Sequence, residues 1–140
     1  MISARASVLI ARPREEVFSF ITDPANDRLW RSHLTASRGT VAGTGDRVTQ
    51  TYSFGGRSAT IELEVSEYAP PERFALRLSN PYRARFAFQC LAESGGTRVG
   101  MSFSADPGGV AQLAEGRIVA EAERLARTDL TRLRNVLESR

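Results

Sequence analysis

The stretch IELEVS (residues 61–66) alternates apolar and polar side chains at every position, and it is the clearest strand signal in the chain. Ile61, Leu63 and Val65 would face a core, while the residues between them would face solvent, as in a half-buried antiparallel strand. The same alternation recurs at residues 48–54, 74–78, 83–90 and 99–103, with glycine, proline and asparagine between the runs. The middle of the chain is therefore predicted to form a series of short antiparallel strands.

Different patterns flank this run of strands. Residues 4–10 alternate as a first strand, Pro13 suits the first turn of a following helix, and Asp23 is positioned to cap a second short helix that extends to Trp30. From Val110 to Ser139 the apolar residues recur at three- and four-residue steps, which predicts one long amphipathic helix. The expected fold class is α+β: a curved antiparallel sheet closed by a long terminal helix, an arrangement that encloses a cavity for a small ligand.

Gly116 interrupts the helical pattern, at a cost of about 1 kcal/mol relative to alanine. Two explanations stand. Either the position is under weak constraint, or a side chain there would intrude on a ligand or a strand.

Size and composition predict a single domain over residues 1–140, with 41% apolar and 25% charged residues. No apolar run approaches the ~20 residues that span a bilayer, and the apolar stretch at residues 8–11 is too short for a signal peptide. Cys90 is the only cysteine, so no intramolecular disulfide can form, and a cytoplasmic location is the simplest expectation.

The charge pattern argues against nucleic-acid binding. The net charge is only +3, and all 19 basic residues are arginines that are scattered from Arg5 to Arg140 with acids between them. A nucleic-acid-binding protein would gather such residues into a basic stripe. The complete preference for arginine over lysine is more typical of a GC-rich genome, and no nucleic-acid partner is expected.

Few residues suit catalysis or metal binding. Cys90 and His33 are the only Cys/His pair, and Cys90 shares its strand face with Phe86 and Phe88, which predicts a core position. No G-x-S-x-G motif and no glycine-rich phosphate loop is present. One histidine and one cysteine also give no support for a zinc site. We therefore predict no catalytic residue, no metal and no cofactor.

Three segments resemble a known family. ARPREEVF (residues 11–18), followed by TDP (residues 22–24) and Trp30, resembles the opening of the polyketide cyclase/dehydrase family of the START-like (SRPBCC) superfamily. EYAPPERF (residues 67–74) and ESGGTRV (residues 93–99) resemble later segments of that family, in the same order. The resemblance implies a helix-grip fold, in which a seven-stranded antiparallel sheet curls around the C-terminal helix and leaves a hydrophobic tunnel.

Members of the superfamily include lipid carriers, plant hormone receptors, chaperone activators, aromatase/cyclases and many uncharacterised bacterial proteins. Some relatives, the ring-hydroxylating oxygenase subunits, hold a mononuclear iron with two histidines and a carboxylate. This chain has only His33, so one subunit cannot build that iron site.

Aromatic, apolar and a few polar side chains on the presumed inner face are the candidate ligand contacts. Gln50 and Tyr52 would supply polar handles, although several members of the set must instead pack the helix against the sheet. Trp30 has a packing alternative, and His33 has the alternative of a surface position at a helix C-terminus. The predicted ligand-binding residues are Trp30, His33, Gln50, Tyr52, Phe54, Leu63, Leu76, Phe86, Phe88, Met101, Phe103, Leu113 and Ile118. Arg77, Arg83 and Arg85 are expected to face solvent, although a bulge that shifts the register by one would turn them inward as counter-ions for an anionic ligand.

The leading functional prediction is binding or transport of a hydrophobic or amphipathic small molecule, lipid-like or polyketide-like, by a monomer or homodimer without a transmembrane segment. The alternative is a cofactor-free cyclase, aromatase or dehydratase that uses the same cavity, with Tyr52, His33 and Gln50 as proton-transfer or oxyanion candidates. A third possibility is protein interaction, which would need an exposed apolar patch on the convex face of the sheet.

Overall fold

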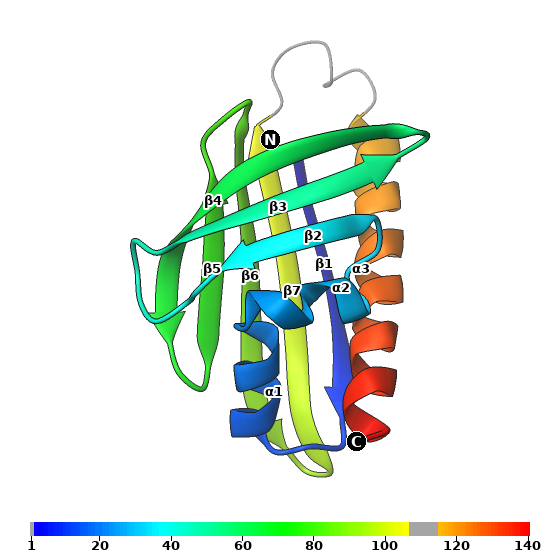
Figure 1. Ribbon diagram of the computed structural model, residues 1–140. Helices are drawn as coiled ribbons and strands as arrows, with labels where there is room; N and C mark the ends of the chain where they lie inside the picture. Colours follow the sequence, from blue (N-terminus) through cyan, green and yellow to red (C-terminus); the bar gives the residue numbers. More distant parts are fainter. Residues whose placement is uncertain (1, 107–114) are drawn as a thin grey trace.

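A seven-stranded antiparallel sheet forms the body of the computed structural model, which describes residues 2–106 and 115–140 (Figure 1). The strand order is β1-β7-β6-β5-β4-β3-β2, so neighbours in sequence pair as hairpins except where β1 pairs with β7. The strands are β1 (Ile2–Ile10), β2 (Leu34–Gly39), β3 (Arg47–Phe54), β4 (Arg57–Ala69), β5 (Arg73–Leu78), β6 (Arg83–Glu93) and β7 (Gly96–Asp106).

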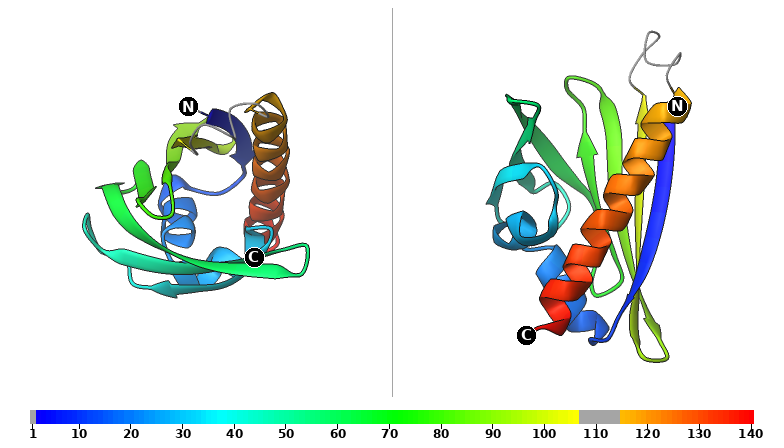
Figure 2. Two further views of the ribbon diagram at one scale, coloured as in Figure 1. Left: turned by 90° about the horizontal axis from the view of Figure 1, so that it is seen from above. Right: turned by 90° about the vertical axis from the view of Figure 1, so that its right-hand side faces the viewer.

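The sheet is strongly curved, and the long helix α3 (Glu115–Glu138) lies along β1 on its concave side (Figure 2). Seen from above, the hairpin of β3 and β4 arches across toward α3, so the sheet and the helix surround an interior space. Helix α1 (Arg14–Ile21), the 3-10 helix η1 (Pro24–Asn26) and helix α2 (Asp27–Trp30) connect β1 to β2. Helix α1 packs against β6 and β7, and α2 packs against α3. This arrangement is the predicted helix-grip α+β fold.

The local signals explain where the first helices begin. Pro13 is the N-cap residue of α1, with φ −63°, and Glu15 and Glu16 lie in the first turn, where acids are favourable. The side chain of Asp23 accepts a hydrogen bond from the backbone N–H of Ala25 at 3.0 Å, so the predicted cap is confirmed. The chain therefore leaves β1, turns through the three helical segments α1, η1 and α2, and enters β2.

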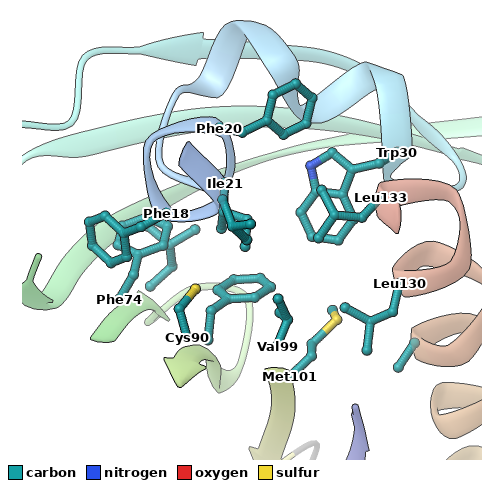
Figure 3. Packing of buried hydrophobic residues seen from close by; sticks show 14 of the residues in the cluster. Phe18, Phe20, Ile21, Trp30, Phe74, Cys90, Val99, Met101, Leu130 and Leu133 are labelled. Atoms are coloured by element: carbon teal, nitrogen blue, oxygen red, sulfur yellow. The ribbon is translucent and has the colours of Figure 1, made fainter. Parts of the chain in front are cut away.

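The core fills the space between α1, the sheet and the C-terminal half of α3 (Figure 3). The ring of Trp30 meets Phe88 edge-on, with centroids 5.9 Å apart, and Phe88 stacks on Phe74 at 6.0 Å. Leu130 and Leu133 approach this cluster from α3. Close packing at this end of the molecule leaves a void of only about 10 Å³ beside the cluster.

The alternation correctly identified the two faces of the sheet. Val48, Leu63 and Leu76 are buried, whereas Arg77, Arg83 and Arg85 are exposed as predicted. Arg77 pairs with Glu64, and Arg85 pairs with Glu67. Cys90 is buried in the core, which confirms its expected role as an apolar filler.

Two elements differ from the pattern. Strand β2 was not predicted from its residues, because LTASRG has no alternation and its pairing with β3 shifts register between Leu34 and Ala36. The long helix was predicted to begin at Val110, but residues 107–114 lie outside the described part of the chain, and the described helix ends at Glu138. Among the described helices, none is both long and apolar enough to cross a bilayer.

Candidate ligand-binding site

A cavity of about 550 Å³ lies between the sheet and α3. Its wall comes from β1, the junction of α2 and β2, the tip of the β3–β4 hairpin, the β5–β6 loop, β6, β7 and α3. The residues that line it are Ala4, Arg31, Ser32, Tyr52, Arg57, Ser58, Ala59, Ile61, Pro81, Tyr82, Phe86, Met101, Phe103, Ala122, Leu125, Ala126 and Asp129.

Most of this wall is apolar. Phe86 and Phe103 are paired across β6 and β7 with ring centroids 5.0 Å apart, and Met101 follows on the same face of β7. On the opposite side, α3 presents the small side chains of Ala122 and Ala126. Because alanine leaves room that a larger side chain would fill, these two positions help to keep the space between helix and sheet open.

The polar end of the cavity is built by Arg31, Ser32 and Asp129. The Nε of Arg31 donates a hydrogen bond of 3.3 Å to Oδ2 of Asp129, and both residues are buried. The other carboxylate oxygen accepts from the backbone N–H of Ser32 at 2.9 Å and from its hydroxyl at 2.5 Å. Both oxygens of Asp129 are therefore occupied by groups that hold the α2–β2 junction against α3.

The guanidinium of Arg31 is also held by aromatic rings. Its Cζ atom lies 5.4 Å from the centroid of Trp30 and 5.9 Å from that of Phe86, both within the range of cation–π contacts. Burial opposes the charge of Arg31, but Tyr52, Asp129 and Asp27 raise its pKa above the ordinary value. Arg31 therefore remains a cation in the wall of an otherwise apolar cavity.

A chain of hydrogen bonds runs from the cavity wall into the core. The hydroxyl of Tyr52 donates to Oε1 of Gln50 at 2.6 Å, and Nε2 of Gln50 donates to Oδ2 of Asp27 at 3.4 Å. The same Asp27 oxygen accepts from the hydroxyl of Ser37 at 2.8 Å. Burial raises the pKa of Asp27 from 3.8 to about 6, against the opposing effects of the hydrogen bond from Ser37 and the charge of Arg31. Burial likewise raises the pKa of the Tyr52 hydroxyl.

The predicted ligand-binding residues fall into several groups in the structure. Tyr52, Phe86, Met101 and Phe103 come together in the cavity wall. Trp30, Gln50, Leu76 and Phe88 instead border a void of about 10 Å³ within the core, and Leu63 is buried in the same core. Leu113 lies outside the described residues, and so do the side chains of Phe54 and Ile118.

His33 does not line the cavity. It lies just after α2, its side chain is exposed, and its backbone has a positive φ of 64°. Its carbonyl oxygen accepts a hydrogen bond from the backbone N–H of Ser53 at 2.8 Å, which joins the start of β2 to β3. The structure therefore favours the surface alternative for His33 over a place at the ligand.

Arg31 and Asp129 were missed by the sequence reasoning. A signal for Asp129 was present, because Ala122, Ala126, Asp129 and Leu133 follow one another at steps of four, three and four residues on one helix face. An isolated acid within a stripe that is otherwise apolar indicates a buried carboxylate that needs a partner. Nothing in the sequence near Arg31 singles it out as that partner.

Groups suited to metal binding or nucleophilic attack are not gathered at this cavity. Within residues 2–106 and 115–140, no cluster of three or more His, Cys, Asp or Glu side chains could hold a metal ion. Burial raises the pKa of the Cys90 thiol to about 12, so it stays protonated at neutral pH.

A curved antiparallel sheet that grips a long C-terminal helix around an apolar cavity defines a START-like, helix-grip protein. The chain belongs to the polyketide cyclase/dehydrase and lipid transport family, whose model matches residues 1–138. Family and fold together support a role in hydrophobic ligand binding or in cyclisation. No curated protein matches the chain by sequence.

Solved structures share this fold at low sequence identity. A protein of unknown function, SA2116 from Staphylococcus aureus, superposes with a TM-score of 0.81 at 12% identity, over 99% of this chain and 94% of its own. MLL2253 from Mesorhizobium loti gives 0.76 at 17% identity, over 98% and 97% of the two chains. The di-domain ARO/CYC BexL of the BE-7585A biosynthetic pathway gives 0.74 at 19% identity, over 99% of this chain and 47% of its own.

Proposed function

We propose that the protein binds and carries a hydrophobic or amphipathic small molecule in the cavity between the sheet and α3. The observation that carries this proposal is the open volume of about 550 Å³ with a largely apolar wall. That volume lies within the usual range for sites that enclose small organic ligands. Affinity would come mainly from burial of apolar ligand surface, at about 25 cal/mol per Å² before the costs of ordering.

The chemistry of the wall favours a carrier over an enzyme. Among the described lining residues, Asp129 is the only carboxylate, and both of its oxygens already accept hydrogen bonds from Arg31 and Ser32. Three of the roughly four lone-pair sites of this carboxylate are used within the protein, whereas a general base needs a lone pair that can reach a proton of the substrate. Asp129 is therefore better suited to hold the wall together than to abstract a proton.

Cyclisation remains the second candidate, and the Tyr52 hydroxyl is the observation that favours it. Tyr52 lines the cavity, and because burial raises its pKa it keeps its proton at neutral pH. Its one proton is donated to Oε1 of Gln50, so the phenol could polarise a carbonyl group of a polyketide-like chain only by exchanging that hydrogen bond for one to the substrate. Gln50 lies behind Tyr52 and His33 lies outside the cavity, so the other two candidates of the sequence prediction would not act directly.

Native mass spectrometry of protein purified from its own host tests the carrier proposal, together with extraction of any bound compound under denaturing conditions. A stoichiometric lipid-like or aromatic ligand would support it and identify the ligand class. A ligand-free mass, combined with conversion of a polyketide-like substrate by the purified protein, would favour the cyclase instead.

A further inference from the structure

Arg31 carries an inference that rests on the proposed function and makes it more specific. Its side chain is only 9% exposed, and it lines the cavity at the junction between α2 and β2. An arginine buried to this extent usually has acceptors for most of its donors, because an unpaired buried charge is costly. The pattern of its hydrogen bonds therefore indicates what the cavity is built to receive.

Arg31 uses only one of its three nitrogens within the described protein. Nε donates to Asp129, whereas neither terminal nitrogen, Nη1 or Nη2, donates a hydrogen bond to any described residue. The only completely enclosed side-chain nitrogen or oxygen without a partner, among the described residues, is Nε1 of Trp30. The terminal nitrogens of Arg31 therefore keep accessible surface. Arg31 borders both the cavity of about 550 Å³ and the core void of about 10 Å³, and of these two only the cavity has room for a ligand.

The surroundings hold this guanidinium in one orientation. Asp129 fixes Nε, and the rings of Trp30 and Phe86 lie within 6 Å of Cζ, at 5.4 and 5.9 Å. Oδ2 of Asp129 accepts from Nε and Oδ1 accepts from Ser32, so none of these hydrogen bonds engages the terminal nitrogens. The free end of a guanidinium is a planar pair of donors whose geometry matches a carboxylate.

The charges around the cavity also favour an anion. Arg31 and Arg57 line it, and Asp129 is the one acidic residue among the described lining residues, so the wall carries an excess of positive charge. Arg132 lies behind this end of the cavity, with Nη1 at 3.4 Å from the hydroxyl of Ser32. Beyond the polar end, Phe103, Met101 and Leu125 offer only apolar contacts.

From this arrangement we infer that the ligand is an amphipathic acid, whose carboxylate is bound by Nη1 and Nη2 of Arg31 and whose apolar body lies against β7 and α3. Arg31 then recognises the head group, and Asp129 positions Arg31. A ligand of the same length without the acid leaves the free donors of Arg31 without an acceptor and binds more weakly.

Calorimetric titration with dodecanoic acid and dodecan-1-ol, at neutral pH and below the micellar concentration, tests this inference. The two probes share their apolar chain, so the ratio of their affinities isolates the head group. Because a hydrogen bond to a charged group adds substantially to affinity, the acid should bind at least about 10-fold more tightly. Dodecyl phosphate, as a third probe, shows whether the site takes a carboxylate or any oxyanion.

Two variants separate recognition by Arg31 from general electrostatics. In the double variant R31M/D129N both buried charges are removed together, and the ratio of acid to alcohol affinity should fall to within about 2-fold of one. Arg28→Gln removes the same unit of charge from an exposed position on α2 that is not among the residues lining the cavity, and it should leave the ratio within about 2-fold of the wild type.

Each outcome separates the inference from the proposed function. Equal affinity of the wild-type protein for acid and alcohol overturns the inference and leaves the carrier proposal intact. An unchanged ratio in R31M/D129N also overturns it, and an equal loss in Arg28→Gln would replace it with long-range attraction. Failure to bind any of the three probes would count against both. If the double variant does not fold, the wild-type ratio still decides the question.

Discussion

The hydroxyl of Tyr52 lies 2.6 Å from Oε1 of Gln50, and this bond connects the cavity wall to a carboxyl group buried in the core. Gln50 in turn donates a hydrogen bond to Asp27, the first residue of α2, and Asp27 also accepts a hydrogen bond from Ser37 on β2. Three elements that curve around the same end of the sheet are thus joined by polar side chains. Substitution of each residue in this network measures its contribution to the free energy of unfolding.

Asp27→Asn should change how stability depends on pH. In the folded protein the pKa of Asp27 is raised from 3.8 to about 6 by burial, so the native state holds more protons than the unfolded state between these values. The stability that comes from the neutral carboxyl is complete below about pH 4 and is lost as the pH rises to about 6. The shift corresponds to about 3 kcal/mol.

Urea unfolding of the wild type and Asp27→Asn from pH 4 to pH 7 measures this effect. The difference between the two free energies of unfolding should move by about 2–3 kcal/mol in favour of the variant as the pH rises. Exposed ion pairs such as Arg98–Glu93 are common to both proteins and cancel in the difference. A constant difference across this range would contradict the raised pKa.

Tyr52→Phe should destabilise the protein without opening a cavity. It removes the hydroxyl that donates to Oε1 of Gln50, a residue that is only 2% exposed. An unsatisfied buried acceptor costs about 1–3 kcal/mol. Tyr82→Phe is the matched control, because Tyr82 lines the same cavity but is 40% exposed, and its effect should stay within about 0.5 kcal/mol.

The same two variants distinguish a carrier from a cyclase. A carrier whose binding rests on apolar contacts should retain its ligand in Tyr52→Phe once the protein is folded. A cyclase that uses the Tyr52 hydroxyl as a proton donor should lose about 100-fold in turnover, with little change in substrate binding. Turnover that is equal in both variants would remove Tyr52 from the chemistry.

Breaking the pair of Arg31 and Asp129 from one side should be strongly destabilising. Asp129→Ala leaves a buried guanidinium without its carboxylate and leaves the backbone N–H of Ser32 without an acceptor. A loss of about 3–5 kcal/mol is expected for a buried pair opened in this way. The loss in R31M/D129A should be smaller than the sum of the two single losses by at least about 1 kcal/mol. Additive losses in urea unfolding would show that the two charges do not depend on each other.

Gly116→Ala should stabilise the protein. Gly116 is exposed within α3, and an added Cβ would meet no described atom within 4 Å, which favours weak constraint over a need for space. A gain of about 1 kcal/mol is expected from helix propensity alone. Gly96→Ala is the contrast, because Gly96 has a φ of 145° and its Cβ would collide with the backbone of Ile10. Thermal unfolding should move in opposite directions for the two variants.

The sequence predicts a structural element well where neighbouring residues alone determine it. The alternation at residues 61–66 and the cap at Asp23 depend on neighbouring residues only, and both features are present in the structure. The residues of β2 do not alternate between apolar and polar. This strand is recognised only from its pairing with β3, which includes a register shift between Leu34 and Ala36. Local patterns therefore predicted most of the elements, including the edge strand β1, but not β2 at the other edge of the sheet.

The site was harder to predict because contacts between distant segments decide which side chains line the cavity and which are buried in the core. Phe86 and Phe88 share one face of β6, yet Phe86 lines the cavity while Phe88 packs against Trp30 in the core. The pair of Arg31 and Asp129 joins residues 98 positions apart, and no spacing rule connects them. Periodicity identifies the face on which a side chain lies, whereas the closing of α3 over the curved sheet decides whether it meets a ligand.

Ala122→Phe tests whether the cavity itself binds the ligand. Ala122 faces the cavity from α3, so a phenylalanine there would occupy space that the ligand needs without displacing a packed core. We expect at least about a 10-fold loss in ligand affinity, while the free energy of unfolding falls by less than the 1–3 kcal/mol typical of an overpacked core. Ala120→Phe places the same side chain at an exposed position of the same helix and should leave binding unchanged. Calorimetry with dodecanoic acid measures both variants, and equal affinities would show that the ligand binds elsewhere on the protein.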